Sequence, residues 1–197
     1  TVVHNAGIID VGPAVHMTCA DYEEALGVHL FGALHLASAA LPGMLEARHG
    51  RIVNIASIAG LVPVPHMLPY DASKAALVGW SEALGAELAG TGVSVTTVCP
   101  ALMRTGSPRN ARFRGRHRKE YAWFSIADSL PLLTIGAERA ARRVVRAAER
   151  GQARLVMPVA MRAAVAAHAL APGLALGALR GAARWLPAPG GVGERSV

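Results

Sequence analysis

Cysteine and lysine are scarce in this sequence. The two cysteines, Cys19 and Cys99, lie far apart, and neither belongs to a CxxC pair or has histidine-rich neighbours. This scarcity argues against a disulfide framework and against a metal site, and it fits a reduced, cytosolic setting. Only two lysines, Lys74 and Lys119, occur among many arginines. A lysine retained against that bias is a candidate for a specific role.

Aromatic and charged side chains are also few. Aromatic residues make up 5% of the chain, and no aromatic-basic platform accompanies the net charge of +7, which argues against a nucleic-acid partner. No pattern typical of a secretory signal peptide opens the sequence. The apolar segment 163–179 contains Pro172-Gly173, so it is a poor membrane span. We expect it to pack on the domain or an oligomer interface, with peripheral membrane contact as the alternative, because arginines and Trp185 flank it.

The rest of the composition indicates one globular domain. With 197 residues, 52% of them apolar, the chain is long enough to bury a core. Apolar, β-branched runs predict strands at 1–6, 51–56, 93–98 and 153–157. Helical patterns predict helices at about 21–40, 69–89 and 137–150. Pro42 is expected to bend the first helix or to begin a second segment.

Three side chains around the strand at 51–56 suggest proton transfer. Tyr70 and Lys74 are four residues apart, so they share one face of the predicted helix. A nearby ammonium lowers the pKa of a phenol, which is otherwise a poor acid or base at neutral pH. Ser57 follows the strand, where its hydroxyl can donate to a substrate oxygen that gains charge. The trio therefore suits acid–base chemistry at a carbonyl or alcohol.

Two further segments accompany this trio. Asn5-Ala6-Gly7 follows the first apolar run, and Pro100-Ala101-Leu102-Met103-Arg104-Thr105 follows a later one. Together with Ser57, thirteen residues before Tyr70, they resemble the short-chain dehydrogenase/reductase family in its single-domain branch. The resemblance runs from Val2 to about Thr105.

The resemblance implies a fold and a cofactor. The fold is α/β, a Rossmann-like, doubly wound parallel sheet in a three-layer sandwich that is truncated at its N-terminal side. The cofactor is NAD or NADP, and the other partner is a small carbonyl or alcohol substrate. The residues implied to bind the cofactor are Asn5, Ala6, Gly7, Tyr70, Lys74, Pro100, Leu102 and Thr105.

The resemblance also implies self-association. In the family, the helices that correspond to 21–40 and 69–89 pair across a two-fold axis, so a homodimer or homotetramer is expected. The second of these helices carries an unusually small face, made of Ala72, Ala75, Ala76, Gly79 and Ala83.

Three departures from the family pattern concern the site. His29 stands where the family has an asparagine that holds a relay water. The histidine is expected either to take part in that proton relay or to be a packed, hydrogen-bonded residue of its helix. Ala101 replaces a glycine, and His4 replaces the first asparagine of the turn at 4–7. The Gly-rich phosphate-binding turn of the family occurs nowhere in the 197 residues, so we expect a fragment or a truncated gene product.

The second half of the chain is assigned partly by resemblance to the family. By position, residues 106–133 resemble the family's lid over the substrate pocket. Their basic run is either a solvated face or an attractant for a phosphorylated or carboxylated substrate. Apolar helices are expected at about 158–186. The domain therefore spans 1–186, and 187–197 is a tail.

The combined interpretation is an NAD(P)-dependent oxidoreductase that transfers a hydride between the cofactor and a secondary alcohol or ketone. Its catalytic residues would be Ser57, Tyr70, Lys74 and His29. One alternative is a non-catalytic remnant that acts only through helix-mediated association. Another is an epimerase or dehydratase of the extended branch, which the spacing of Ser57 and Tyr70 disfavours.

Overall fold

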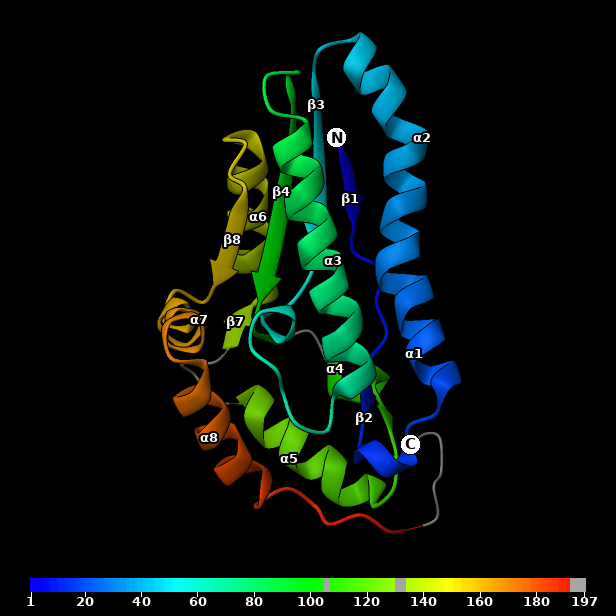
Figure 1. Cartoon of the computed structure of the whole chain (residues 1–197), viewed down its shortest axis with the longest axis vertical. Coiled ribbons are helices and arrows are strands. Elements are labelled where there is room, and N and C mark those ends of the chain that lie inside the picture. Colours follow the sequence, from blue (N-terminus) through cyan, green and yellow to red (C-terminus); the bar gives the residue numbers. More distant parts are fainter. Residues whose placement is uncertain (105–106, 130–133, 192–197) are drawn as a thin grey trace.

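A four-stranded parallel sheet forms the centre of the protein (Figure 1). The computed structural model describes residues 1–104, 107–129 and 134–191. The strands are β1 (Val2–His4), β3 (Gly50–Ile55), β4 (Val93–Pro100) and β8 (Arg154–Met157), hydrogen-bonded in that order. All neighbours are parallel, so their carboxyl ends lie at one edge. This confirms the predicted α/β fold with a doubly wound, Rossmann-like sheet.

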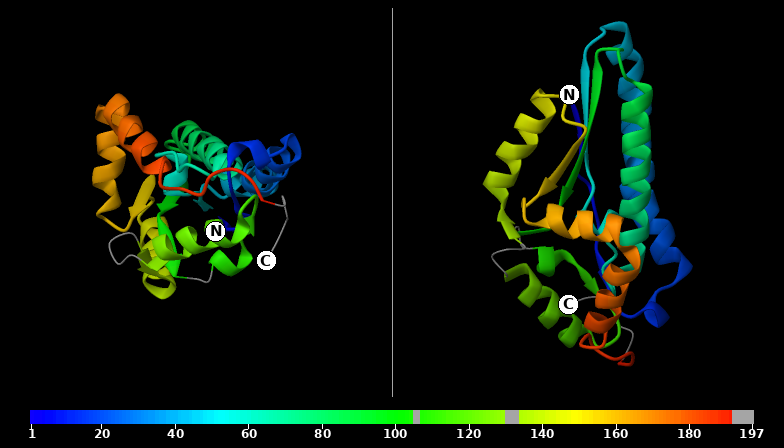
Figure 2. Two further views of the ribbon diagram at one scale, coloured as in Figure 1. Left: turned by 90° about the horizontal axis from the view of Figure 1, so that it is seen from below. Right: turned by 60° about the vertical axis from the view of Figure 1, so that its left-hand side comes forward.

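Helices cover both faces of the sheet. One face carries α1 (Cys19–Leu26), α2 (Gly32–Glu46) and α3 (Leu68–Glu87), and the other carries α6 (Ala137–Glu149). The right-hand view in Figure 2 shows the sheet between these two layers. A π-helical turn, Gly27–Phe31, joins α1 to α2. The helix α2 continues through Pro42 to Glu46, so this proline does not begin a second segment.

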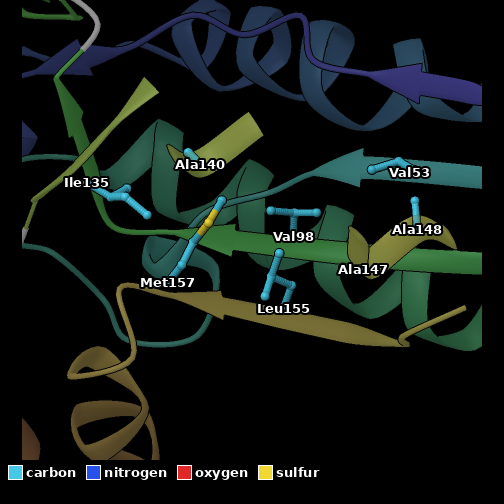
Figure 3. Close-up of a cluster of buried hydrophobic side chains, with 8 residues drawn as sticks. All are labelled: Val53, Val98, Ile135, Ala140, Ala147, Ala148, Leu155 and Met157. Carbon is cyan, nitrogen blue, oxygen red and sulfur yellow. The ribbon is translucent and has the colours of Figure 1, made fainter. Parts of the chain in front are cut away.

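Apolar side chains fill the space on each side of the sheet. Figure 3 shows the cluster under α6, where sheet residues such as Val53, Val98 and Leu155 meet Ala140 and Ala147. The small side chains on α6 allow it to lie close to the sheet, and burial of this apolar area favours the folded state. A second cluster packs the opposite face against α2 and α3; its buried members are Ala33, Ala56, Leu77, Val78, Cys99 and Val156.

The carboxyl edge of the sheet is covered by short elements that the sequence patterns did not indicate. Two-residue strands β2 (Asp10–Val11) and β6 (Arg112–Phe113) pair with each other, as do β5 (Leu102–Arg104) and β7 (Thr134–Gly136). Strands this short carry no periodicity that could reveal them. The remaining short elements are η1 (Ala14–His16), η3 (Ile58–Gly60) and α4 (Ser107–Asn110).

Longer helices complete this end of the molecule. They are α5 (His117–Ser129), α7 (Met161–Leu170) and α8 (Pro172–Ala183), and Figure 1 shows α5 and α8 beyond the sheet's carboxyl edge. The apolar helices expected at about 158–186 are present as α7 and α8, and the chain bends by 119° between them, just before Pro172. By length and composition alone, the continuous helix Cys19–Glu46 is long and apolar enough to cross a membrane, and so is the bent α7–α8 pair. Ala33 and Ala37 of the continuous helix are buried in the protein core.

Candidate active site

A cavity of about 630 Å³ opens at the carboxyl edge of the sheet. In open α/β sheets this edge is the usual place for ligands. Seven of the residues predicted for catalysis or cofactor binding line it: Asn5, Gly7, Ser57, Tyr70, Lys74, Pro100 and Leu102. These residues come from segments that lie up to 97 positions apart in the chain, and only the parallel arrangement of the strands brings them together.

Ser57 sits where strand β3 gives way to the short helix η3. Its backbone is extended, and its Oγ accepts a hydrogen bond of 3.1 Å from the backbone N–H of Ala59, so it caps η3. The helix η3 lies directly against α3: a Cβ added at Gly60 would lie 2.6 Å from the carbonyl oxygen of Lys74. The glycine therefore permits the close approach that sets Ser57 beside the side chains of α3.

Tyr70 is half-buried in the first turns of α3, and its side chain is hydrogen-bonded to Ser57. Burial raises the pKa of its phenol, the Ser57 hydrogen bond lowers it, and the carboxyl of Asp71 raises it further. The net shift is upward. The predicted lowering of this pKa by Lys74 does not appear, because burial has the largest effect.

Asp71 and Lys74, which follow Tyr70 on α3, are both buried. Asp71 accepts a hydrogen bond of 2.9 Å from the backbone N–H of Val64, and burial raises the pKa of its carboxyl to about 7. The Lys74 ammonium lies 5.6 Å from the centre of the Tyr70 ring and donates to the carbonyl oxygen of Ile55 at 2.8 Å. Burial lowers the pKa of Lys74 to about 8. This pKa is only slightly above neutral pH, so the lysine is mostly charged there.

His29 is fully buried behind Tyr70, and its ring meets that of Tyr70 edge-on with centroids 5.4 Å apart. Its Nε2 accepts a hydrogen bond of 3.1 Å from the backbone N–H of Ile8, which can only donate. The proton must then reside on Nδ1, which donates to the Oγ of Ser73 at 2.7 Å. The Ser73 hydroxyl in turn donates to the carbonyl oxygen of Pro69 at 2.8 Å. A single neutral tautomer of His29 satisfies all of these hydrogen bonds.

The environment of His29 bears on the predicted proton relay. Burial, followed by the charge of Lys74, lowers the pKa of the imidazole to about 3. Both ring nitrogens are already engaged in hydrogen bonds, and His29 does not line the cavity. The histidine joins the turn after β1 to helix α3 and has no free lone pair for a relay in this state. The π-helical turn that carries it is a feature often found near functional sites.

The other predicted positions have different outcomes. Ala6 belongs to the turn after β1 but is absent from the cavity lining. Among the residues that the structure describes, only Arg48 and His66 combine a side chain with a positive φ, so Ala101 fits ordinary backbone in place of the family's glycine. Thr105 lies outside the described residues.

Several lining residues carried no signal in the sequence. Val64 and Met67 come from the loop after η3, Trp123 and Phe124 from α5, and Met161 from α7. Trp123 and Phe124 bring aromatic rings to the cavity lining, and Phe124 is also buried in the core. Met161 is an apolar residue in an apolar helix, so nothing in the sequence distinguishes it from a core residue.

A buried carboxylate fixes the lid helix. Glu120 of α5 is fully buried, and it accepts hydrogen bonds from the Trp123 indole N–H at 2.6 Å and from Nδ1 of His66 at 3.0 Å. His66 belongs to the loop that carries Met67, and its backbone carbonyl accepts from Gly12 at 2.7 Å. Glu120 thereby joins two walls of the cavity. Sequence reasoning missed it because nothing local marks a buried glutamate.

Two arginines of the predicted basic run do not face solvent or substrate. Arg112 pairs with Asp10 at 2.5 Å and with Glu24 at 2.7 Å. Arg114 is buried and pairs with Asp10 and Asp21. The basic run was expected to face solvent or to attract an anionic substrate. These two arginines do neither, because they join the lid to the start of α1. Arg109, Arg116, Arg118 and Lys119 are exposed, as the solvated-face interpretation predicts.

Comparisons with known proteins agree with this geometry. The family model described as "short chain dehydrogenase" matches residues 1–114. The ketoacyl reductase HetN of Nostoc sp. is 39% identical over 112 residues, which cover 56% of this chain and 39% of that protein. The putative oxidoreductase SadH of Mycobacterium tuberculosis is 35% identical over 159 residues, which cover 79% of this chain and 56% of that protein.

A solved structure shares the fold over nearly the whole chain. A short-chain dehydrogenase from Streptomyces avermitilis matches with a TM-score of 0.72 and 27% identity, over 93% of this chain and 70% of its own. The chain spans about 39% to 56% of the lengths of the two curated relatives named above. The match of the family model to more than half of the sequence, and its agreement with the fold and the cavity, show that the chain belongs to the short-chain dehydrogenase family.

Proposed function

We propose that this chain carries the chemical centre of an NAD(P)-dependent oxidoreductase that interconverts a secondary alcohol and a ketone. The observation that supports it most is the meeting of Ser57, Tyr70 and Lys74 on one cavity at the carboxyl edge of a parallel sheet. Membership of the family supports oxidoreductase chemistry in general, and the assignment of steps to residues is our proposal.

The lining residues fit the nicotinamide part of the cofactor. The hydrogen bond from Lys74 to Ile55 uses one of three ammonium donors, so two remain for ribose hydroxyls. Asn5 and Gly7 on one side, and Pro100 and Leu102 on the other, line the same cavity as this ammonium. When bound, the nicotinamide supplies or accepts the hydride. The proposal covers both NAD and NADP.

Each residue of the trio has a distinct role in this proposal. In reduction, Tyr70 donates its phenolic proton to the carbonyl oxygen, and in oxidation it takes that proton back. The raised pKa keeps the phenol protonated at neutral pH, as donation requires. Ser57 donates a hydrogen bond to the same oxygen as negative charge develops there. The charge of Lys74 stabilises the phenolate left after donation, and this support should fade above about pH 8, where the lysine deprotonates.

Replacement of Tyr70 by Phe tests the proposal. In the protein that carries this chain, the variant should lower kcat by about 10²- to 10⁴-fold, because the proton donor is lost. Turnover is measured from the change in nicotinamide absorbance, and circular dichroism checks the fold. The matched control is Tyr22→Phe in α1, a half-buried tyrosine outside the cavity. Near-normal turnover by Tyr70→Phe would show that Tyr70 is not the proton donor.

His29 has a positioning role in this proposal. Its hydrogen bonds join Ile8, next to the predicted cofactor turn, to Ser73 in α3, next to Tyr70 and Lys74. It would hold the turn and the catalytic helix in register while it remains neutral. A relay through His29 requires one of these two hydrogen bonds to open when ligands bind.

Both ring nitrogens of His29 are hydrogen-bonded, which leaves none for a relay. This observation supports a second candidate, the non-catalytic remnant. In that case the chain would associate through its helices and bind no cofactor. Calorimetric titration with NADH and with NADPH separates the two candidates. Sub-millimolar binding would count against the remnant.

Two surfaces support further parts of the proposal. Ala72, Ala75, Gly79 and Ala83 of α3 are exposed along one face, which suits the predicted pairing into a homodimer or homotetramer. Leu170 of α7, Leu174 of α8 and Trp185 just after α8 are 80% to 90% exposed. Residues 150–193 contain arginines but no acidic residue. Charge and apolarity there suit peripheral contact of a cytoplasmic protein with an anionic bilayer.

A further inference from the structure

Besides the predicted cofactor residues, the cavity has an apolar wall. It is formed by Val64, Met67, Trp123, Phe124 and Met161. Four of these pack in one cluster with Tyr70, so the proposed proton donor is itself part of the apolar wall. A substrate whose carbonyl reaches Tyr70 must therefore lay its neighbouring atoms against this surface.

The described part of the lining offers almost no charge to a substrate. Lys74 is the one lining side chain there that is charged at neutral pH; it is buried and donates to the carbonyl of Ile55. None of the lid's described cations lines the cavity. Arg112 and Arg114 are held away from it by carboxylates of Asp10, Asp21 and Glu24.

The polar atom of the largest lining side chain is also occupied. The Trp123 indole N–H donates to Glu120 at 2.6 Å, and Glu120 is fully buried and also bonded to His66. A buried indole N–H with a partner has no need of a ligand acceptor. Trp123 therefore presents ring carbon to the cavity. The remaining lid amide, Asn110, is exposed at the rim.

We propose, on the basis of the function proposed above, that the substrate is an uncharged and mainly apolar ketone or secondary alcohol, whose only polar group near the site is the reacting oxygen. Burial of apolar surface against this wall favours binding, by roughly 25 cal/mol per Å² removed from water. A carboxylate or phosphate placed there would lose its hydration without gaining a counter-ion. The cavity therefore selects against the phosphorylated or carboxylated substrates that the basic run had suggested.

Two ketones that differ by one charge test this inference. Acetophenone and 4-acetylbenzoate share the reacting group and the ring, and only the second carries a carboxylate. Binding to the chain is followed by NMR from the Trp123 indole N–H signal, assigned by its loss in Trp123→Phe. We expect acetophenone to shift this signal and to bind at least tenfold more tightly than 4-acetylbenzoate. Equal or tighter binding of the benzoate, or no shift with either ketone, would overturn the inference.

Two variants locate the origin of the discrimination. Asn110→Arg adds a cation at the exposed rim and should raise the affinity for 4-acetylbenzoate severalfold. Lys119→Glu changes an exposed lid charge outside the lining and should leave the affinity ratio of the two ketones unchanged. If Lys119→Glu instead weakens the benzoate alone, the lid charges recruit anions and the inference is wrong.

The binding readout separates this inference from the proposed function. Tight acetophenone binding without turnover in the presence of NADH or NADPH would support the apolar class and count against the oxidoreductase. Turnover that favours 4-acetylbenzoate would support the oxidoreductase and overturn the apolar class.

Discussion

At the scale of single residues, burial controls the chemistry of this site. Tyr70, Asp71 and Lys74 lie within two turns of α3. Burial raises the pKa of Tyr70 and of Asp71 and lowers that of Lys74, so it favours the neutral form of each. His29 shows the same effect most strongly, with a pKa of about 3. The sequence motif by itself suggests charged side chains in contact. In the folded protein these side chains are buried, and burial disfavours their charged forms.

Replacement of His29 by Asn tests its place in the structure. We expect a loss of about 1–3 kcal/mol at pH 7.5, because the N–H of Ile8 and the Oγ of Ser73 lose a fitted partner. The folded-state pKa of His29 is depressed from 6.5 to about 3, so the unfolded chain binds more protons between these values. This contribution of His29 to stability is therefore full above about pH 6.5 and declines as the pH falls toward 3.

The loss caused by His29→Asn should accordingly be smaller at pH 5 than at pH 7.5. Urea unfolding at the two pH values measures it, and His35→Asn, an exposed position of α2, is the control. A loss that is the same at both pH values would contradict a buried, neutral histidine.

At the scale of elements, the lid is held by two buried polar clusters. Glu120 joins α5 to the loop after η3, and the pairs of Arg112 and Arg114 with Asp10 join β6 to β2. These contacts fix how α5 and its neighbouring segment lie against the rest of the protein. The position of Trp123 over the cavity depends on that selection.

Replacement of Glu120 by Ala should loosen the lid. The change leaves a buried indole N–H and a histidine nitrogen without partners, so we expect a loss of about 2–4 kcal/mol in unfolding free energy and faster amide exchange in α5. Denaturant titration and hydrogen–deuterium exchange measure the two effects. Glu138→Ala in α6 is the control, because Glu138 is exposed in an i,i+4 pair with Arg142 and should matter little. Unchanged exchange in α5 would show that Glu120 does not hold it.

At the scale of the whole molecule, two surfaces remain unpaired in a single chain. The helix layer covers one face of the sheet yet leaves apolar side chains exposed, among them Phe31 of the π-helical turn and Leu36 and Leu45 of α2. The C-terminal pair of helices has no buried residue at all. A layer that is covered on one side only is a candidate for association with a second copy or with another surface.

Replacement of Ala75 by Arg tests association through α3. A bulky cation on the exposed small face should prevent close helix approach, so we expect the variant to elute as a monomer. Size-exclusion chromatography with light scattering gives the mass. The control, Ala163→Arg, places the same side chain on the exposed surface of α7. An oligomer that survives Ala75→Arg but not Ala163→Arg would place the interface on the C-terminal helices.

Contact of α7 and α8 with membranes gives a separate prediction. The protein should co-sediment with vesicles that contain anionic phospholipid more than with neutral ones, and Trp185→Ala should weaken this binding severalfold. Val15→Ala, another exposed apolar residue, is the control and should have no effect. Equal sedimentation with neutral vesicles, or none with either kind, would rule out this use of the surface.

The sequence alone predicted the four strands of the central sheet and the α/β fold, and it brought forward the residues from which the site is proposed. These predictions rest on local patterns: β-branched runs for strands, periodic apolar faces for helices, and the spacing of Ser57, Tyr70 and Lys74. Such patterns can be recognised in the sequence because they involve residues that are near one another along the chain. The tertiary structure decided what depends on distant neighbours: the burial that sets the pKa of Tyr70, the neutral tautomer of His29, the buried Glu120 and the removal of Arg112 and Arg114 from the cavity. Each of these is fixed by desolvation and by partners tens of residues away, which no local pattern encodes.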